Sequence, residues 1–186
     1  TYMRNSQTLS NAYNSNKNNQ EYDFDGDGEN DELSIISTNS TYSLKIKNSL
    51  RDTLLKSNEF DYSLLDISPS SAIKISYIDL NRNKIPELII SGLKNNKSTL
   101  YIFKWENNSF QEVFFTQNNI LSILDFNNSK TPKIYTTSSS KGDEATECYI
   151  LNSTTLKDIS VSSPKIPSLN SIQLLIDCVE ADYELD

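Results

Sequence analysis

The sequence predicts an all-β, mainly antiparallel protein made of about three similar sheet units, with a helix at its C-terminal end. Three observations lead to this fold class. An acidic loop early in the chain runs directly into a β-branched segment. The frame of that loop recurs twice downstream. Short stretches of alternating polar and apolar residues, separated by polar turns, fill most of the remaining chain.

The acidic loop covers residues 23–33, DFDGDGENDEL, with carboxylates at its first, third, fifth and ninth positions. Calcium prefers roughly six to eight oxygen ligands, and alternating acids on a tight turn supply them. Gly28, at the sixth position, can take the positive φ angle that such a turn needs. The predicted ligands of a Ca2+ ion are Asp23, Asp25, Asp27, Asp31 and, through its backbone carbonyl, Glu29.

The residues after the loop decide which kind of calcium loop it is. An EF-hand carries a bidentate Glu at the twelfth position and continues into a helix. Here the twelfth residue is Ser34, and Leu33 to Ser37 is a short, β-branched segment bounded by polar residues. The loop is therefore predicted to join two strands and to use the ion to fix a β-turn.

The frame of this loop recurs in residues 77–90 and, in a more divergent form, in residues 124–135. The aligned first aspartates, Asp23, Asp79 and Asp125, are 56 and 46 residues apart. Such periods are typical of propeller blades or related stacked β-units. Closed propellers have about four to eight blades. We therefore expect about three blade-like repeats in an open or partial propeller, unless the N-terminal segment completes a fourth blade.

The second loop keeps the frame but loses negative charge. Its equivalent ligands are Asp79, Asn81, Asn83, Glu87 and the carbonyl of Ile85. Lys84 occupies the glycine position and Arg82 adds another cation, so calcium binding there should be strongly weakened. A lysine of the chain could replace the ion, or hydrogen bonds alone could hold the turn. In the third loop Lys130 and Lys133 take the sixth and ninth positions, and no ion is expected.

The pattern Asp-x-Asp-x-Asp-Gly-x-x-Asp-x-Leu, followed by a strand, resembles the FG-GAP or VCBS repeat, whose calcium loops occur in integrin-type β-propellers. The second copy is similar over more of its length, from Ile75 to Leu93 and through the hairpin at residues 99–113. Residues 1–9 are similar to the segment after the lipidated cysteine in repeat-bearing surface lipoproteins of low-GC Gram-positive bacteria. This resemblance implies an exported protein with a lipid anchor upstream of Thr1.

Alternating hydrophobicity places the strands. They are predicted at residues 33–37, 42–47, 71–78, 87–91, 99–106, 110–116, 120–126, 133–137, 147–152 and 155–160. The link Thr38 to Thr41 makes the first two strands a hairpin. Residues 48–70 are ambiguous, because Leu50, Leu54 and Leu55 have the spacing of one short helix inserted between repeats.

The chain changes character after Pro164. Apolar residues at helical spacing, with Ser168 as a plausible N-cap, predict a helix from Ser168 to Ala181 that covers an open sheet edge or docks a partner. The domain organisation is thus a flexible N-terminal leader (residues 1–20), a β-repeat domain (21–163) and an amphipathic helix with a tail (164–186).

Composition narrows the function classes. The formal charge of −8 and a pI near 4.6 argue against nucleic-acid binding. No apolar run is long enough to cross a bilayer, although a leader could have been cleaved. The absence of histidine excludes Ser-His-Asp and Cys-His catalysis within this chain. Cys148 and Cys178 could form a disulfide in an exported protein or remain two buried thiols.

These features favour a non-enzymatic, calcium-binding extracellular surface domain that acts as a scaffold or recognition module. Its ligand would be an unknown protein or glycan at the cell surface. One alternative is a structural subunit of a bacterial surface assembly. Another is an accessory module of a carbohydrate-active enzyme, although no pair of acids stands out from the calcium loop.

Overall fold

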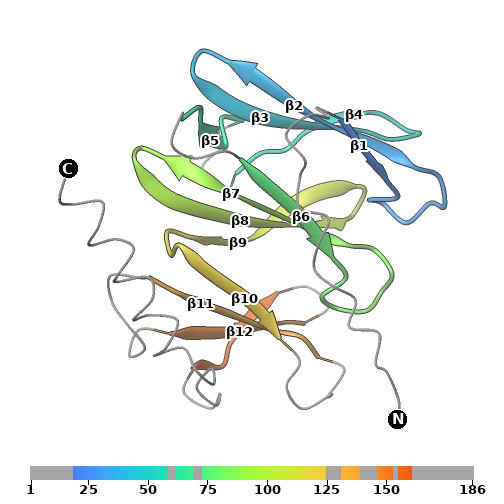
Figure 1. Cartoon of the computed structure of the whole chain (residues 1–186). Helices are drawn as coiled ribbons and strands as arrows, with labels where there is room; N and C mark the ends of the chain where they lie inside the picture. Colours follow the sequence, from blue (N-terminus) through green and yellow to red (C-terminus); the bar gives the residue numbers. More distant parts are fainter. Residues whose placement is uncertain are drawn as a thin grey trace, which may run out of the picture.

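Three antiparallel sheets follow one another along the chain (Figure 1). The structure is a computed structural model that describes residues 19–57, 62–68, 73–124, 131–138, 146–152 and 155–160. The first sheet contains β1 (Asn19–Tyr22), β2 (Asp31–Thr38), β3 (Thr41–Lys47), β4 (Asp52–Leu54) and β5 (Leu65–Asp66). The second contains β6 (Lys74–Ile78), β7 (Glu87–Lys94), β8 (Lys97–Glu106) and β9 (Ser109–Thr116). The third contains β10 (Ile120–Leu124), β11 (Lys133–Thr137), β12 (Glu147–Leu151) and β13 (Leu156–Asp158).

Strands that are neighbours in sequence are neighbours in each sheet, apart from β5, which pairs with the far end of β3. All of the paired strands run antiparallel, which confirms the predicted all-β, antiparallel fold class. The hairpin through Thr38 and Thr41 is also confirmed. Within the residues that the structure describes, the three sheets do not close into a ring (Figure 1).

The predicted insertion helix is wrong where the structure describes residues 48–70. β4 pairs with β3, with Leu54 opposite Lys45, so the backbone is extended there. The three leucines do not share a face. Leu55 is fully buried, whereas Leu50 is 71% exposed. Their spacing fits a helix, but pairing with β3 imposes a period of two on the side chains.

The predictions for the two ends of the chain have different outcomes. The first sheet begins at Asn19, inside the last residues of the predicted leader, because β1 pairs along β2. Its sequence, NQEY, is polar and carries no apolar alternation, so only the pairing identifies it as a strand. The predicted helix from Ser168 to Ala181 lies outside the described residues.

The second sheet is the centre of the molecule because both of its faces are buried. Alternate residues of a strand point to opposite faces. One face of β7 and β8 joins the core shared with the first sheet, through Leu88, Ile90, Tyr101 and Phe103. The other face joins the core shared with the third sheet, through Ile89, Leu100 and Ile102. This explains the nearly continuous apolar run in β7 and β8.

The first sheet, by contrast, presents a polar face outward. Leu33, Leu44 and Ile46 point into the core that it shares with the second sheet. The residues between them on β2 and β3, among them Ser34 and Lys45, point to the opposite face. The first sheet therefore buries one face only.

The burial of both faces of β8 can be tested by shortening one of its buried side chains. Ile102→Ala should lower the free energy of unfolding by about 2–5 kcal/mol, because it leaves a cavity in the core between the second and third sheets. Lys97→Ala, at the exposed start of the same strand, should change it by less than about 0.5 kcal/mol. Urea denaturation of the two variants gives the comparison, and equal small effects would contradict the described core.

Candidate metal centre

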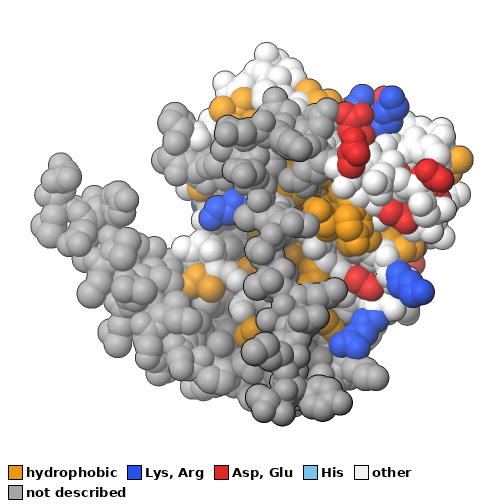
Figure 2. All heavy atoms as spheres, turned by 45° about the vertical axis from the view of Figure 1, so that its right-hand side comes forward, with side chains coloured by type: hydrophobic (Ala, Val, Ile, Leu, Met, Phe, Trp, Pro, Cys, Tyr) orange, Lys and Arg blue, Asp and Glu red, His pale blue; other side chains and the backbone are white. Residues whose placement is uncertain are grey.

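Each sheet opens with a loop of the same length between its first two strands. The residues paired at the loop ends, always nine positions apart, are Tyr22 with Asp31, Ile78 with Glu87, and Leu124 with Lys133. The first two loops lie on the same side of the molecule, at the right of Figure 1. Figure 2 turns that side forward and shows acidic and basic side chains around an apolar area. Residues 125–130 of the third loop lie outside the described residues.

The first loop folds its acids inward through hydrogen bonds from its own backbone. The two carboxylate oxygens of Asp23 accept the backbone N–H groups of Gly26 and Gly28, at 2.6 and 3.0 Å. The carboxylates of Asp25 and Asp27 each accept the N–H two residues further on, at 3.0 and 2.8 Å. One ligand oxygen from each of the three aspartates lies within 4.8 Å of the others. The structure therefore brings Asp23, Asp25 and Asp27 together, and their binding of an ion stays a prediction.

Asp31 lies deeper than these three. It is the first residue of β2, is 1% exposed, and its Oδ2 accepts the backbone N–H of Phe24 at 2.8 Å. Burial raises the pKa of Asp31 to about 6, and repulsion from the charges of Asp25, Asp27 and Asp23 acts in the same direction. Its ionised form is therefore disfavoured unless positive charge is supplied nearby. Asp31 is not one of the three clustered aspartates.

The turn between β3 and β4 supplies two further partners, which the sequence did not indicate. Asn48 Nδ2 donates to Asp25 Oδ2 at 3.0 Å, and Ser49 Oγ donates to Asp27 Oδ2 at 2.6 Å. The Ser49 hydroxyl and the N–H of Glu29 lower the pKa of Asp27, which is exposed. Glu29 contributes this backbone N–H to the loop, while its side chain is exposed.

Two glycines allow the first loop its shape. Gly28 has a φ of +92°, which confirms that the sixth position needs a positive φ, and an added Cβ there would meet open space. Gly26 has a φ of +81°, and an added Cβ would lie 2.7 Å from Cγ1 of Ile85. Ile85 belongs to the second loop, so the two loops touch through Gly26. That contact gives Gly26 a role that its position in the sequence did not indicate.

The second loop repeats the hydrogen bonds of the first, except that one oxygen of its first aspartate accepts an N–H from one residue further along. The N–H groups of Asn83 and Lys84 donate to Asp79, at 3.1 and 2.8 Å. Asn81 and Asn83 accept the N–H two residues further on, at 3.0 and 2.8 Å, the latter from Ile85. Arg82 and Lys84, with φ of +63° and +72°, stand where the first loop has Gly26 and Gly28.

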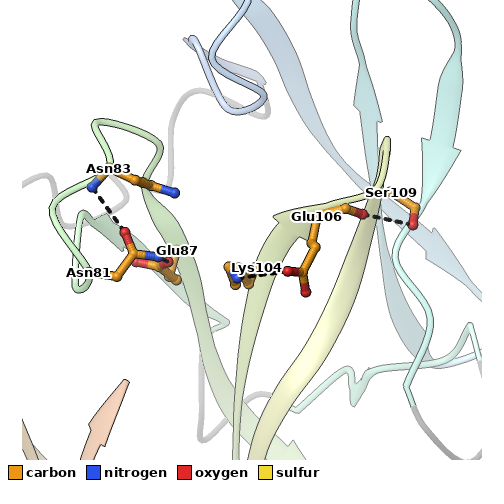
Figure 3. A network of polar contacts seen from close by, with 6 residues as sticks. All are labelled: Asn81, Asn83, Glu87, Lys104, Glu106 and Ser109. Atoms are coloured by element: carbon orange, nitrogen blue, oxygen red, sulfur yellow. Dashed lines mark hydrogen bonds and ion pairs between the residues drawn. The ribbon is translucent and has the colours of Figure 1, made fainter. Parts of the chain in front are cut away.

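Glu87 takes the position of Asp31. It is the first residue of β7, is 1% exposed, and accepts the N–H of Leu80 at 2.7 Å. Burial raises the pKa of Glu87 to about 7, whereas the Leu80 N–H and the Lys104 charge favour the ionised form. Asn81 Nδ2 donates to the other oxygen of Glu87 at 2.9 Å (Figure 3). The acid at this position thus has an amide donor beside it, where the first loop has another acid, Asp25.

The donor set of the first loop fits a hard cation. Calcium–oxygen bonds are about 2.3–2.6 Å long, so oxygens on one ion lie no more than about 5 Å apart. The oxygens of Asp23, Asp25 and Asp27 meet that limit. Within the described part of the chain, no Lys or Arg forms an ion pair with these three aspartates or with Asp31. The arrangement could therefore bind a hard cation as its counter-charge.

Cys148 is buried on β12 and is not bonded within the described residues. Cys178 lies outside them, so the disulfide between the two stays a prediction.

No protein-family model matches the chain, and no curated protein or solved structure is significantly similar to it. Its function must therefore be inferred from its own residues and their geometry.

The contact between the two loops predicts different effects of alanine at the two glycines. Gly28→Ala should cost about 1–2 kcal/mol of stability, from the positive φ alone. Gly26→Ala should cost more, about 2–5 kcal/mol, because the new Cβ also displaces Ile85. Chemical denaturation in a calcium chelator measures both variants, and equal losses would show that the loops do not press on one another.

Proposed function

We propose that this protein is a non-enzymatic, calcium-binding extracellular domain in which one Ca2+ ion, held by the first loop, stabilises the start of the fold. The observation that carries the proposal is the cluster of Asp23, Asp25 and Asp27, whose oxygens lie within 4.8 Å of one another. Their carboxylates and the buried carboxylate of Asp31 are all negative when ionised, and a divalent ion would neutralise them.

Calcium suits this loop better than magnesium does. Magnesium demands a nearly ideal octahedron at about 2.0–2.1 Å and gives up its water reluctantly, whereas calcium accepts irregular sets of protein oxygens. A turn whose acids alternate with backbone groups offers such an irregular set. The carboxylates of the aspartates and the backbone carbonyl of Glu29 are the proposed ligands.

The resemblance of the loop to FG-GAP or VCBS repeats supports a surface role. In this proposal the three sheets are blade-like repeats of an open propeller. The protein is exported and held at the cell surface by a lipid anchor upstream of Thr1, as a scaffold or recognition module for a protein or glycan. Extracellular calcium is abundant enough to fill weak sites, so an exported loop can use the ion purely as structure.

One further observation agrees with this proposal. Of the described residues, only three acids are buried, and Glu87, the one outside the first loop, accepts hydrogen bonds from Leu80 and Asn81. These contacts give Glu87 a structural role. Among the described residues there is no helix long and apolar enough to span a membrane.

Calcium should raise the thermal stability of the wild-type protein. At a free concentration of one hundred times Kd, a ligand adds about 2.7 kcal/mol, which corresponds to roughly 5–10 °C in Tm for a domain of this size. Asp25→Asn should abolish most of that rise, because it removes a ligand charge while keeping the shape and the acceptor for the Asp27 N–H. Differential scanning calorimetry in calcium and in chelator measures both.

Asp52→Asn is the matched control. Asp52 is an exposed acid on β4 that pairs with Lys45, so its removal changes the net charge equally but leaves the loop intact. The control should keep the full calcium-induced rise in Tm. A wild-type Tm that does not respond to calcium would overturn the proposed function, as would an equal response of Asp25→Asn and Asp52→Asn.

A further inference from the structure

Lys104 is a buried lysine near the C-terminal end of β8, in the second sheet. It lies on β8, is 5% exposed, and its Nζ is 3.3 Å from Glu106 Oε1. Leu88 pairs with Phe103 across β7 and β8, which places Lys104 opposite Glu87, one step further along the ladder. Figure 3 shows the Lys104 side chain between those of Glu87 and Glu106. A lysine this well buried normally needs negative partners.

The register also identifies what stands at this place in the first sheet. There Glu32 pairs with Lys47, so the residue opposite Asp31 is Asn48. Asn48 is the residue whose amide holds Asp25 at 3.0 Å. The two sheets therefore carry the same pair of positions beside the loop, with an acid and an amide in the first and an acid and an ammonium in the second.

We propose that the Lys104 ammonium and the Asn81 amide take the place of a metal ion in the second loop. The second loop, together with the buried acid that follows it, would then be a permanent, ion-free copy of the first. Asn81 donates to one oxygen of Glu87, as an ion would contact it, and the Leu80 N–H holds the other. Lys104 supplies the positive charge. The comparison with an ion rests on the proposed function of the first loop, but the Lys104–Glu87 charge pair can be tested whether or not that loop binds calcium.

The charges around the two loops agree with this assignment. The first loop carries five acids in residues 23–31 and no basic residue. The second loop carries Asp79 and Glu87, offset by Arg82 and Lys84 within the loop and by Lys104 beside it. A divalent ion at the second loop would therefore have to approach a buried ammonium through two exposed cations, which is electrostatically unfavourable.

Lys104 also forms an ion pair with Glu106, which helps to fix its position. Glu106 ends β8, and its backbone carbonyl accepts a hydrogen bond from Ser109 Oγ at 3.3 Å across the tight turn to β9 (Figure 3). Gln111 Nε2 in turn donates to Ser109 Oγ at 2.6 Å. The turn thus fixes the backbone of Glu106, whose carboxylate contacts the ammonium, while Glu87 lies opposite Lys104 on β7.

A double-mutant cycle in chelator tests the proposed role of Lys104. Lys104→Met should lower Tm by roughly 5–15 °C, because it leaves Glu87 without its positive partner. In a Glu87→Gln background, which removes the buried charge and keeps one of the two acceptor oxygens, the same change should lower Tm by less than half as much. The matched cycle with Glu106→Gln should show a weaker coupling, because Glu106 is partly exposed.

Additive effects of Lys104→Met and Glu87→Gln would overturn the proposal, since they would show that the two charges do not interact. If Lys104→Met does not fold, calcium titration by calorimetry gives an independent answer. The Asp25→Asn variant, with the first loop disabled, should show no binding that depends on the second loop. Calcium binding in that variant that disappears on adding Asp79→Asn would also overturn the proposal. Failure of the proposed function alone would appear differently, as a wild-type protein that ignores calcium while the Lys104–Glu87 coupling persists.

Discussion

A carboxylate buried at the first residue of the second strand is the constraint around which both described loops are built. Asp31 and Glu87 each hold the backbone N–H of the residue that follows the first loop aspartate, Phe24 and Leu80. This hydrogen bond ties the start of the loop to its end, and each acid is 1% exposed. A carboxylate in so dry a place is unfavourable when ionised unless donors and a positive charge surround it. The residues around each loop differ in how they supply those donors and that charge.

The sheets differ at two equivalent positions: the loop residue beside the buried acid and the residue opposite that acid on the next strand. In the first sheet the acid, Asp31, has three further aspartates within electrostatic reach, and its cross-strand neighbour is the neutral Asn48. In the second sheet the neighbouring loop residue is an amide and the cross-strand residue is Lys104. In the third sheet the requirement is absent, because Lys133 takes the acid's place and pairs with Ile150. The position at the start of the second strand is thus an acid opposite an amide in the first sheet, an acid opposite an ammonium in the second, and a lysine in the third.

Much of this could be read from the sequence, because it depends on local pattern. Alternation placed β2 and β3, and the spacing of acids gave the frame of the loops and the positive φ of Gly28. Features that depend on strand register could not be read. Lys104 lies seventeen residues after Glu87, and only the pairing of β7 with β8 brings them together. Asn48 beside Asp25 was missed for the same reason. The leucines after β3 have helical spacing, but the segment is extended because β4 pairs with β3, and the sequence alone does not show that pairing.

The contact between Gly26 and Ile85 connects these local corners to the whole molecule. The first loop is pressed against the second, and behind them Leu33 and Leu88 belong to one core between the first two sheets. The second sheet is in turn buried on both faces, so its own loop cannot shift without disturbing the core that it shares with the third sheet. A permanent counter-charge at the central sheet and an exchangeable one at the outer sheet is a consistent arrangement. The sheet on which both neighbours depend would then hold its shape whatever the calcium concentration, and only the first sheet, with its polar outer face, would respond to the ion.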